Sequence, residues 1–272
     1  MTFDDGPSKN TEKVLDILDA YDAKATFFLI GSEVSEEYRE TLERLIEEGH
    51  AVGLHSNVHR FEKLYVNEEA CLKDYEAEYE KLKLEYGIET KMFRFPGGSA
   101  CSYMNGQRKS YIQKMQENGY RCFDWNVSGE DSVGTPTVWS IQNHVFQDVF
   151  KYNEPIILLH DSKISDITVE ALPGILEKLK EEGYLFKTLE EKEEYVNKLF
   201  SSIGYKKPVE VVKADNPYYY RNKVMMAFKK ATDGASYLIY NYADSEGPMQ
   251  FGPAYPLING DLYQYDFDNN QM

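Results

Sequence analysis

Short apolar runs alternate with longer amphipathic segments through residues 1–190, and this alternation limits the fold more than any other feature of the chain. The apolar runs are typical of buried strands, whereas apolar residues three or four positions apart predict helices. Strands that alternate with helices are joined by crossover connections, so neighbouring strands run parallel and the class is α/β. About six or seven such units could close into a barrel, with active-site residues at the C-terminal ends of the strands.

The spacing predicts elements with definite bounds. The helix expected over 35–49, for example, has Ser35 as its N-cap, glutamates in its first turn and Gly49 at its end. The predicted helices cover 11–21, 35–49, 67–87, 110–119, 137–150 and 169–183. The predicted strands cover 2–3, 24–30, 51–55, 91–95, 120–127, 155–160 and 184–189.

Composition changes twice in the last part of the chain. Residues 192–230 are rich in Lys and Arg, whereas residues 231–272 contain neither and are acidic and rich in Tyr. Each shift is a candidate boundary. We therefore expect a main domain over 1–191, a basic segment over 192–230 and a tail of unknown fold over 231–272.

Charge and hydropathy exclude several functional classes. The net charge of −16 argues against nucleic acid or an anionic membrane as the main partner, and favours a neutral polymer or a small ligand. No apolar run approaches the roughly 18 residues of a membrane span, and no secretory signal is evident. Three cysteines in no CxxC pattern predict free thiols.

Ionisable residues lie at or just beyond the ends of five predicted strands, so we expect their side chains at one rim of the sheet. No single residue is compelling, but their shared placement is. These residues are Asp4 and Asp5, His55, Arg94, Asp131 and His160.

The pair of histidines in HSNVH suggests a metal site. His55 and His59, four residues apart, would lie on one face of a helical turn. A bare pair of this spacing is as often two surface or capping histidines. A carboxylate ligand favours the metal, because Asp5 with the two histidines makes a set suited to catalytic zinc or a similar divalent ion.

The neighbouring carboxylates Asp4 and Asp5 would point to opposite sides of a regular strand. We expect the Gly6-Pro7 turn to reorient the backbone, so that Asp4 can act as a base toward a water activated by the metal. An ordinary Asp-rich turn is the commoner meaning of DDGP in isolation.

Five motifs in this order resemble those of the NodB-homology polysaccharide deacetylases. They are TFDDGPS, HSNVH, RFPGGS, FDWNVSGED and ILLHD. The resemblance covers about residues 1–190 and implies a distorted (β/α) barrel. The form of the third and fourth motifs is similar to a branch found in Gram-positive bacteria, whose substrates are N-acetylated cell-wall glycans.

The resemblance also implies roles for individual residues. It makes Asp4 the base and Arg94 the residue that orients it, His160 the general acid and Asp131 its partner. The backbone N–H of Gly97 would donate to the oxyanion. It further implies that Leu158 shapes the acetyl pocket and that Asp5, His55 and His59 hold the metal; Asp124 receives no catalytic role.

The implied enzyme is a metal-dependent hydrolase that removes N-acetyl groups from peptidoglycan or a chitin-like polymer. Its metal is expected to be zinc, with cobalt, nickel or manganese as alternatives. We expect a monomer that acts on acetylated polysaccharide outside the cytoplasm or in the cell envelope. The alternatives are an O-acetyl esterase on xylan or another acetylated glycan, and an inactive glycan-binding remnant.

Two departures from the family and one further resemblance complete the prediction. The chain begins inside the expected first strand, so this truncated strand is expected to fray and to weaken the fold or the metal site. Ser132 stands where many members have Trp, which would open one wall of the site. Residues of about 195–230 are weakly similar to a segment of RNA uracil-5-methyltransferases, which we expect to be an appendage without activity of its own.

Overall fold

The computed structural model describes residues 1–152, 154–191, 225–230, 236–242, 250–258 and 261–262. These residues form two units, one of Met1–Val149 with Pro155–Leu189, the other of Phe150–Glu154 with Glu190–Met272. In the first unit the elements are β1 (Thr2–Gly6), α1 (Lys9–Ala20), β2 (Thr26–Leu29), η1 (Glu36–Tyr38), α2 (Arg39–Glu47), β3 (Ala51–Leu54), α3 (Phe61–Leu64), α4 (Glu68–Tyr86), β4 (Met92–Phe93), η2 (Ser102–Met104), α5 (Arg108–Glu117), β5 (Arg121–Cys122), β6 (Val127–Ser128), α6 (Val138–Val149), β7 (Ile157–His160) and α7 (Asp166–Glu181).

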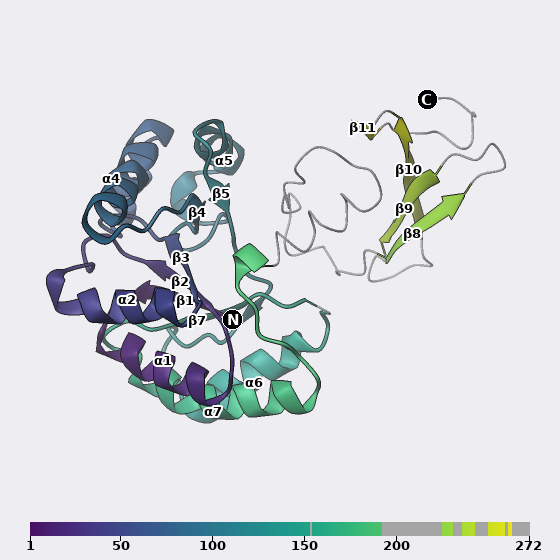
Figure 1. Cartoon of the computed structure of the whole chain (residues 1–272). Coiled ribbons are helices and arrows are strands. Elements are labelled where there is room, and N and C mark those ends of the chain that lie inside the picture. Colours follow the sequence, from purple (N-terminus) through teal and green to yellow (C-terminus); the bar gives the residue numbers. More distant parts are fainter. Residues whose placement is uncertain (153, 192–224, 231–235, 243–249, 259–260, 263–272) are drawn as a thin grey trace. The chain divides into compact units, whose positions relative to one another are not determined.

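The first unit is built on a seven-stranded parallel sheet in the order β5-β4-β3-β2-β1-β7-β6. Helices α1, α6 and α7 pack beside one another along one side, and α4 and α5 pack together elsewhere on the sheet (Figure 1). The expected parallel α/β class and the distorted barrel are thereby confirmed. The first strand, expected to fray, lies in the middle of the sheet with a partner on each side.

The sheet must be curled, because the link between its two edge strands is too short to span a flat sheet. β5 ends at Cys122 and β6 begins at Val127, yet they lie at opposite edges. Five Cα steps reach at most about 18 Å, whereas seven flat strands would separate their edges by about 29 Å. The segment 123–126 therefore crosses the open side of the half-barrel. The single strand predicted over 120–127 is wrong, since these residues divide between the two edges.

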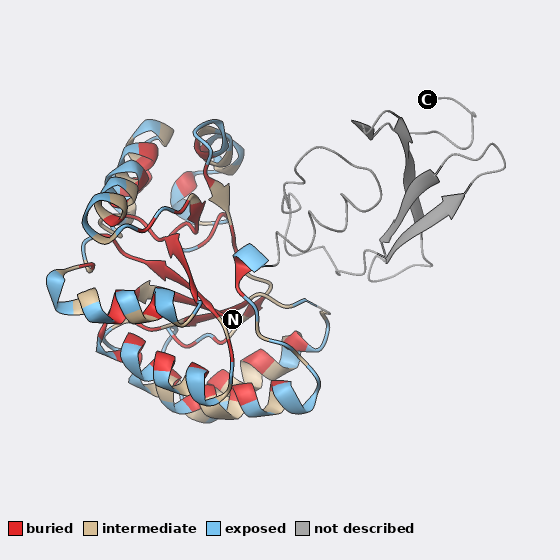
Figure 2. Cartoon of the chain, viewed as in Figure 1, coloured by how far each residue is buried: buried red, intermediate tan, exposed pale blue. Residues whose placement is uncertain are grey.

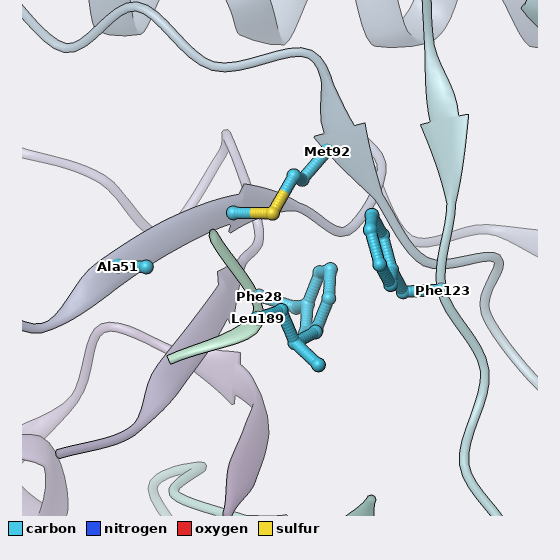
Figure 3. Close-up of a cluster of buried hydrophobic side chains, with 5 residues drawn as sticks. All are labelled: Phe28, Ala51, Met92, Phe123 and Leu189. Carbon is cyan, nitrogen blue, oxygen red and sulfur yellow. The ribbon is translucent and has the colours of Figure 1, made fainter. Parts of the chain in front are cut away.

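The core lies between the sheet and its covering helices. Figure 2 shows the strands of the first unit as largely buried, with helices exposed on their outer faces. One buried cluster joins Phe28, Ala51 and Met92 from adjacent strands to Phe123 of the crossing segment and to Leu189 (Figure 3). The predicted strand over 184–189 is absent. Its last residue, Leu189, instead donates its amide to Thr26 Oγ1 at 3.0 Å and places its side chain in this cluster.

The second unit contains a four-stranded antiparallel sheet. Its strands are β8 (Met225–Lys230), β9 (Ser236–Tyr242), β10 (Gln250–Ile258) and β11 (Asp261–Leu262), in the order β11-β10-β9-β8. The sheet crosses the composition boundary at residue 230, because β8 belongs to the basic segment and β9 to the acidic tail. Most of residues 195–230, for which the sequence suggested a weak likeness to RNA uracil-5-methyltransferases, lies outside the described residues. Among the helices that the structure describes, none is both long and apolar enough to cross a bilayer.

Candidate active site

The two carboxylates near the chain start lie together because the first strand is irregular. The register between β1 and β2 shifts between Asp4 and Gly6, and Asp5 has a left-handed φ of 76°. Such a bulge breaks the alternation of side chains along a strand, and Asp tolerates a positive φ better than most residues. The backbone is therefore reoriented at Asp5 itself, one residue before the Gly6-Pro7 turn to which the sequence pointed.

The histidines of HSNVH meet across a loop, so the predicted helical turn is wrong. Residues 55–60 contain no helix, and α3 begins only at Phe61. Ser56 and His59 adopt left-handed φ values of 74° and 49°. These turns bring the imidazole rings of His55 and His59 to a centroid separation of 5.1 Å.

Asp5, His55 and His59 each offer one ligand atom within 4.8 Å of the others. Asp5 Oδ1 lies 3.4 Å from His55 Nε2 and 3.3 Å from His59 Nε2. It is buried and accepts no hydrogen bond in the described part of the chain. These three residues form the candidate metal centre.

The protonation of His55 shows that this centre suits a cation. Its Nδ1 lies 2.9 Å from Arg94 O, a carbonyl that can only accept, so Nδ1 carries the proton. Burial lowers the pKa of His55 to about 3, so the ring is neutral and Nε2 presents a lone pair. A lone pair that faces the oxygen of Asp5 is repulsive unless a cation lies between them. The donor set therefore fits a divalent metal, with two histidines and one carboxylate.

Asp4 is buried beside the metal centre and is held by Arg94. Arg94 Nη1 donates to Asp4 Oδ1 at 2.7 Å, while Asp4 Oδ2 lies 3.7 Å from His55 Nε2. Burial raises the pKa of Asp4 above its ordinary value, although the charges of Arg94 and His160 act in the opposite direction. A raised pKa makes this carboxylate a stronger base at neutral pH.

Arg94 directly follows β4, is fully buried, and connects this strand to β1 and to the crossing segment 123–126. Besides Asp4, its guanidinium donates to Thr2 Oγ1 at 2.8 Å and to the carbonyls of Phe123 at 2.8 Å and Asp124 at 3.1 Å. It therefore ties the crossing segment 123–126 to the central strand β1. The Asp124 side chain accepts from the Ser99 amide at 2.9 Å and from the Ser99 hydroxyl, which is a structural contact.

His160 ends β7 and forms a close pair with Asp131. Its Nδ1 lies 2.8 Å from Asp131 Oδ1, and its amide donates to Asp131 Oδ2 at 2.8 Å. Thr168 Oγ1 of α7 donates to the same Oδ2 at 2.7 Å. Burial lowers the pKa of His160, but the hydrogen bond and charge of Asp131, with Asp4 and Asp5, outweigh it and raise the pKa to about 9.

The pairing of strands β1 and β7 brings Asp4, on the metal side of the candidate site, next to His160. Asp4 and His160 are Cα partners on the neighbouring strands β1 and β7. Leu158 is buried in β7 two residues before His160, and alternate residues of a strand share one face. Leu158 and His160 therefore occupy the same face of the sheet.

Gly97 lies in a left-handed turn after Pro96, with φ of 74°. A Cβ at this position would lie 3.1 Å from Phe61 Cε1 and 3.2 Å from Cys101 Sγ, so a larger residue would have to displace these side chains as well as adopt the left-handed φ. The Phe61 ring in turn contacts the ring of His59 at a centroid distance of 5.7 Å. Gly97 thus lies close to the metal side of the site.

Asp161 was missed as a candidate, although it ends the ILLHD motif. It is fully buried, its amide donates to Asp4 O at 3.1 Å, and its Oδ2 accepts from Thr11 Oγ1. Burial, with the charges of Asp5 and Asp4, raises the pKa of Asp161 to about 7. A Cβ on Gly6 would lie 2.5 Å from Asp161 Oδ2, so the two residues share one tightly packed space.

Known proteins resemble this chain in sequence. The family model described as polysaccharide deacetylase matches residues 1–123. A peptidoglycan-N-acetylglucosamine deacetylase of Bacillus cereus is 37% identical over 201 residues, which cover 72% of this chain and 70% of that protein.

Solved structures agree as well. The catalytic domain of a peptidoglycan N-acetylglucosamine deacetylase from Eubacterium rectale matches with a TM-score of 0.63 and 32% identity, over 69% of this chain and 86% of that one. A family 4 acetyl xylan esterase from Clostridium thermocellum in complex with cobalt matches with a TM-score of 0.60 and 27% identity, over 74% and 90% of the two chains. The chain therefore belongs to the polysaccharide deacetylase family of metal-dependent enzymes that remove acetyl groups from polysaccharides.

Proposed function

We propose that this enzyme hydrolyses the N-acetyl groups of N-acetylglucosamine units in peptidoglycan or a chitin-like polymer, with zinc held by Asp5, His55 and His59. The observation that carries the proposal is the convergence of two sets of groups. The three ligand atoms lie within 4.8 Å of one another, and Asp4 and His160 are register partners on adjacent strands. Metal ligands, a base and an acid therefore lie at one rim.

The metal, when bound, supplies Lewis-acid chemistry that polarises the acetyl carbonyl and acidifies a water molecule. Asp4 accepts the proton of the attacking water through Oδ2, because Oδ1 accepts from Arg94. The water oxygen bonds to the carbonyl carbon, and the carbonyl oxygen becomes the oxyanion. The backbone N–H of Gly97 donates to this oxyanion, and such a donor typically contributes about 2.7–4 kcal/mol to catalysis.

His160 gives the proton that the leaving nitrogen needs. Its Nδ1 is occupied by Asp131, so Nε2 is the nitrogen that donates. With its pKa raised to about 9 by the neighbouring carboxylates against the effect of burial, the ring is charged at neutral pH. The C–N bond breaks as this proton moves to the amine, and acetate is released. Leu158 forms the apolar wall for the acetyl methyl group.

The relatives support an N-acetylated glycan as the substrate class, since the bacterial proteins cited above are named for peptidoglycan N-acetylglucosamine. The strongly acidic balance of the chain favours a neutral polymer over a polyanion. The competing function is O-acetyl ester hydrolysis on xylan, which the structural likeness to an acetyl xylan esterase supports. The same groups can cleave either bond, because both reactions pass through a tetrahedral oxyanion.

Acetate release separates the functions. Purified protein loaded with zinc is given N-acetylglucosamine oligomers, peptidoglycan and acetylated xylan, beside a His59→Ala variant. Release from the first two substrates that the variant lacks would support the proposal. Release from acetylated xylan alone would assign the esterase instead. No release from any substrate by folded, zinc-bound protein would favour a glycan-binding remnant.

Metal identity, location and organisation belong to the same proposal. Activity restored to apoprotein by zinc, cobalt, nickel and manganese in turn tests zinc against the other ions. The substrate class supports action outside the cytoplasm or in the cell envelope. We also propose that the enzyme is a monomer, which sedimentation of the purified chain tests. We also propose that 1–191 is the deacetylase domain, with 192–230 and 231–272 as appendages. Equal acetate release by the full chain and by residues 1–191 would support it.

A further inference from the structure

The backbone of the metal-ligand loop, residues 55–59, requires support from outside the loop. Ser56 and His59 both have left-handed φ values, which cost free energy in residues other than glycine. Both metal-binding histidines are fixed by this backbone. Metal affinity therefore depends on whatever holds the loop in this conformation.

Asp74 of α4 holds the middle of the metal-ligand loop. One oxygen, Oδ2, accepts from Ser56 Oγ at 2.6 Å and from the Asn57 amide at 2.7 Å. Ser56 Oγ in turn accepts from the His59 amide at 3.0 Å. A continuous chain of hydrogen bonds therefore joins Asp74 through the Ser56 hydroxyl to the ligand His59.

Glu78, one helical turn after Asp74, holds the start of the same loop. It is fully buried, and its Oε1 accepts from the His55 amide at 3.2 Å. A Cβ at Gly31 would lie 3.0 Å from Glu78 Cγ and 2.5 Å from Asn57 Oδ1, so the three residues are closely packed. The carboxyl group has little freedom to leave the His55 amide.

Lys81, further along α4, fixes a second loop, residues 31–34, which packs against the metal-ligand loop. Its Nζ donates to the carbonyls of Gly31 at 2.8 Å and Val34 at 2.6 Å. The amides of Gly31 and Ser32 donate to the carbonyls of Ser56 and Asn57 at 3.2 and 2.7 Å. One face of α4 therefore holds both loops.

We propose that Asp74 and Glu78 are positioning residues that preorganise His55 and His59 for the metal. The inference rests on the proposed metal site. The inference extends the description of that site beyond its three ligands, because residues that orient metal ligands typically contribute about 10–100-fold to metal affinity. Neither residue is among the proposed metal ligands, the base or the acid, and the hydrogen bonds cited above join both to the metal-ligand loop. Their effect is on the angle and position of the two imidazole rings.

The experiment measures zinc binding to the full chain by competition with a chromophoric chelator. Asp74→Ala removes the acceptor, whereas Asp74→Asn keeps an oxygen in its place. Glu78→Met and Glu78→Gln make the same comparison at the second position. Glu76→Ala, at an exposed carboxylate of the same helix, is the matched control. We expect the Ala and Met variants to bind zinc about 10–100-fold more weakly, with affinity largely kept by Asn, Gln and the control.

Wild-type zinc affinity in folded Asp74→Ala and Glu78→Met would overturn the inference. Should Asp74→Ala fail to fold, Ser56→Ala breaks the same hydrogen-bond chain from the loop side, and unchanged affinity there is equally contrary. His59→Ala distinguishes the two levels of the argument. If His59→Ala loses zinc while the α4 variants keep it, only the positioning role fails. If His59→Ala also binds as the wild type does, the proposed metal site itself fails.

Discussion

Asp131 accepts two hydrogen bonds from His160, one from the ring Nδ1 and one from the backbone amide, both at 2.8 Å. The amide bond fixes the position of the carboxylate relative to the strand, and the ring bond fixes the rotation and tautomer of the imidazole. The pair thus favours the charged form of His160 and fixes the direction of its other ring nitrogen, Nε2.

Replacement of Asp131 should move the alkaline limit of activity. The pKa of His160 is raised to about 9, so the proton that we propose it donates is held below that pH and lost above it. Asp131→Asn removes the charge that opposes burial, so the alkaline limb of kcat/KM should shift to lower pH. Activity measured from pH 6 to 10 on a glycan oligomer, with the exposed Glu76→Gln of α4 as control, checks this. An unchanged limb would show that His160 is not the titrating acid.

Arg94→Met should destabilise the fold by leaving Asp4 buried without its partner. Removal of one member of a buried ion pair typically costs about 3–5 kcal/mol. The double variant Arg94→Met/Asp4→Asn should regain part of the lost unfolding free energy, because the second change removes the unpaired charge of Asp4. Urea unfolding of the wild type, the single variants and the double variant measures this coupling. Additive effects of the two changes would contradict it.

Removal of the metal should abolish activity without unfolding the protein. Treatment with a chelator is expected to stop acetate release, and added zinc to restore it. Asp5→Ala removes the only carboxylate of the centre and should require much more zinc for the same recovery. Circular dichroism before and after chelation serves as the control. Full activity in metal-free protein would falsify the assignment of this centre as essential.

Asp161 should make stability depend on pH in one direction. Its pKa is raised by burial from 3.8 to about 7, so between these pH values the folded protein keeps a proton that the unfolded chain has released. The contribution of Asp161 to the free energy of unfolding is therefore at its most favourable below about pH 4 and declines as the pH rises toward 7. The difference in unfolding free energy between the wild type and Asp161→Asn should fall across this window. A difference that grows with pH would have the wrong sign.

Leu189→Ala should destabilise the main domain, although the residue lies outside every strand. Its side chain is 5% exposed in the cluster with Phe28, Met92 and Phe123. Loss of a buried leucine typically costs about 2–5 kcal/mol. Leu185→Ala is the matched control, because that side chain is 83% exposed and should change stability by less than about 0.5 kcal/mol. Equal unfolding midpoints for the two variants would contradict the packing role.

The parallel α/β class could be predicted because hydrophobic periodicity reports directly on burial in strands and helices. The division of residues 120–127 between two sheet edges could not, since a continuous apolar run carries no information about pairing partners. Arg94 holds this segment through the carbonyls of Phe123 and Asp124, which are contacts distant in sequence. The apolar residues of 184–189 misled the prediction in another way. Leu189 is buried in the core, which the sequence pattern reports, but it does not join the sheet.

The identities of the candidate site residues were available from the motifs, but their geometry was not. The spacing of His55 and His59 predicted a helical turn, whereas the structure uses two left-handed residues in a loop. That loop conformation depends on Asp74 and Glu78, which read in sequence as ordinary charges on a charged helix. The carboxylate Asp161 was likewise invisible as a buried group, because only the packed fold removes it from water.

The central position of β1 has a consequence for synthesis of the protein. A ribosome releases β1 and the proposed base Asp4 long before it releases β7, which pairs with β1 and carries His160. Until β7 has emerged, one side of β1 has no partner and the nascent chain lacks its proposed acid. The proposed base and acid can therefore come together only after β7 has emerged, late in the translation of the first unit.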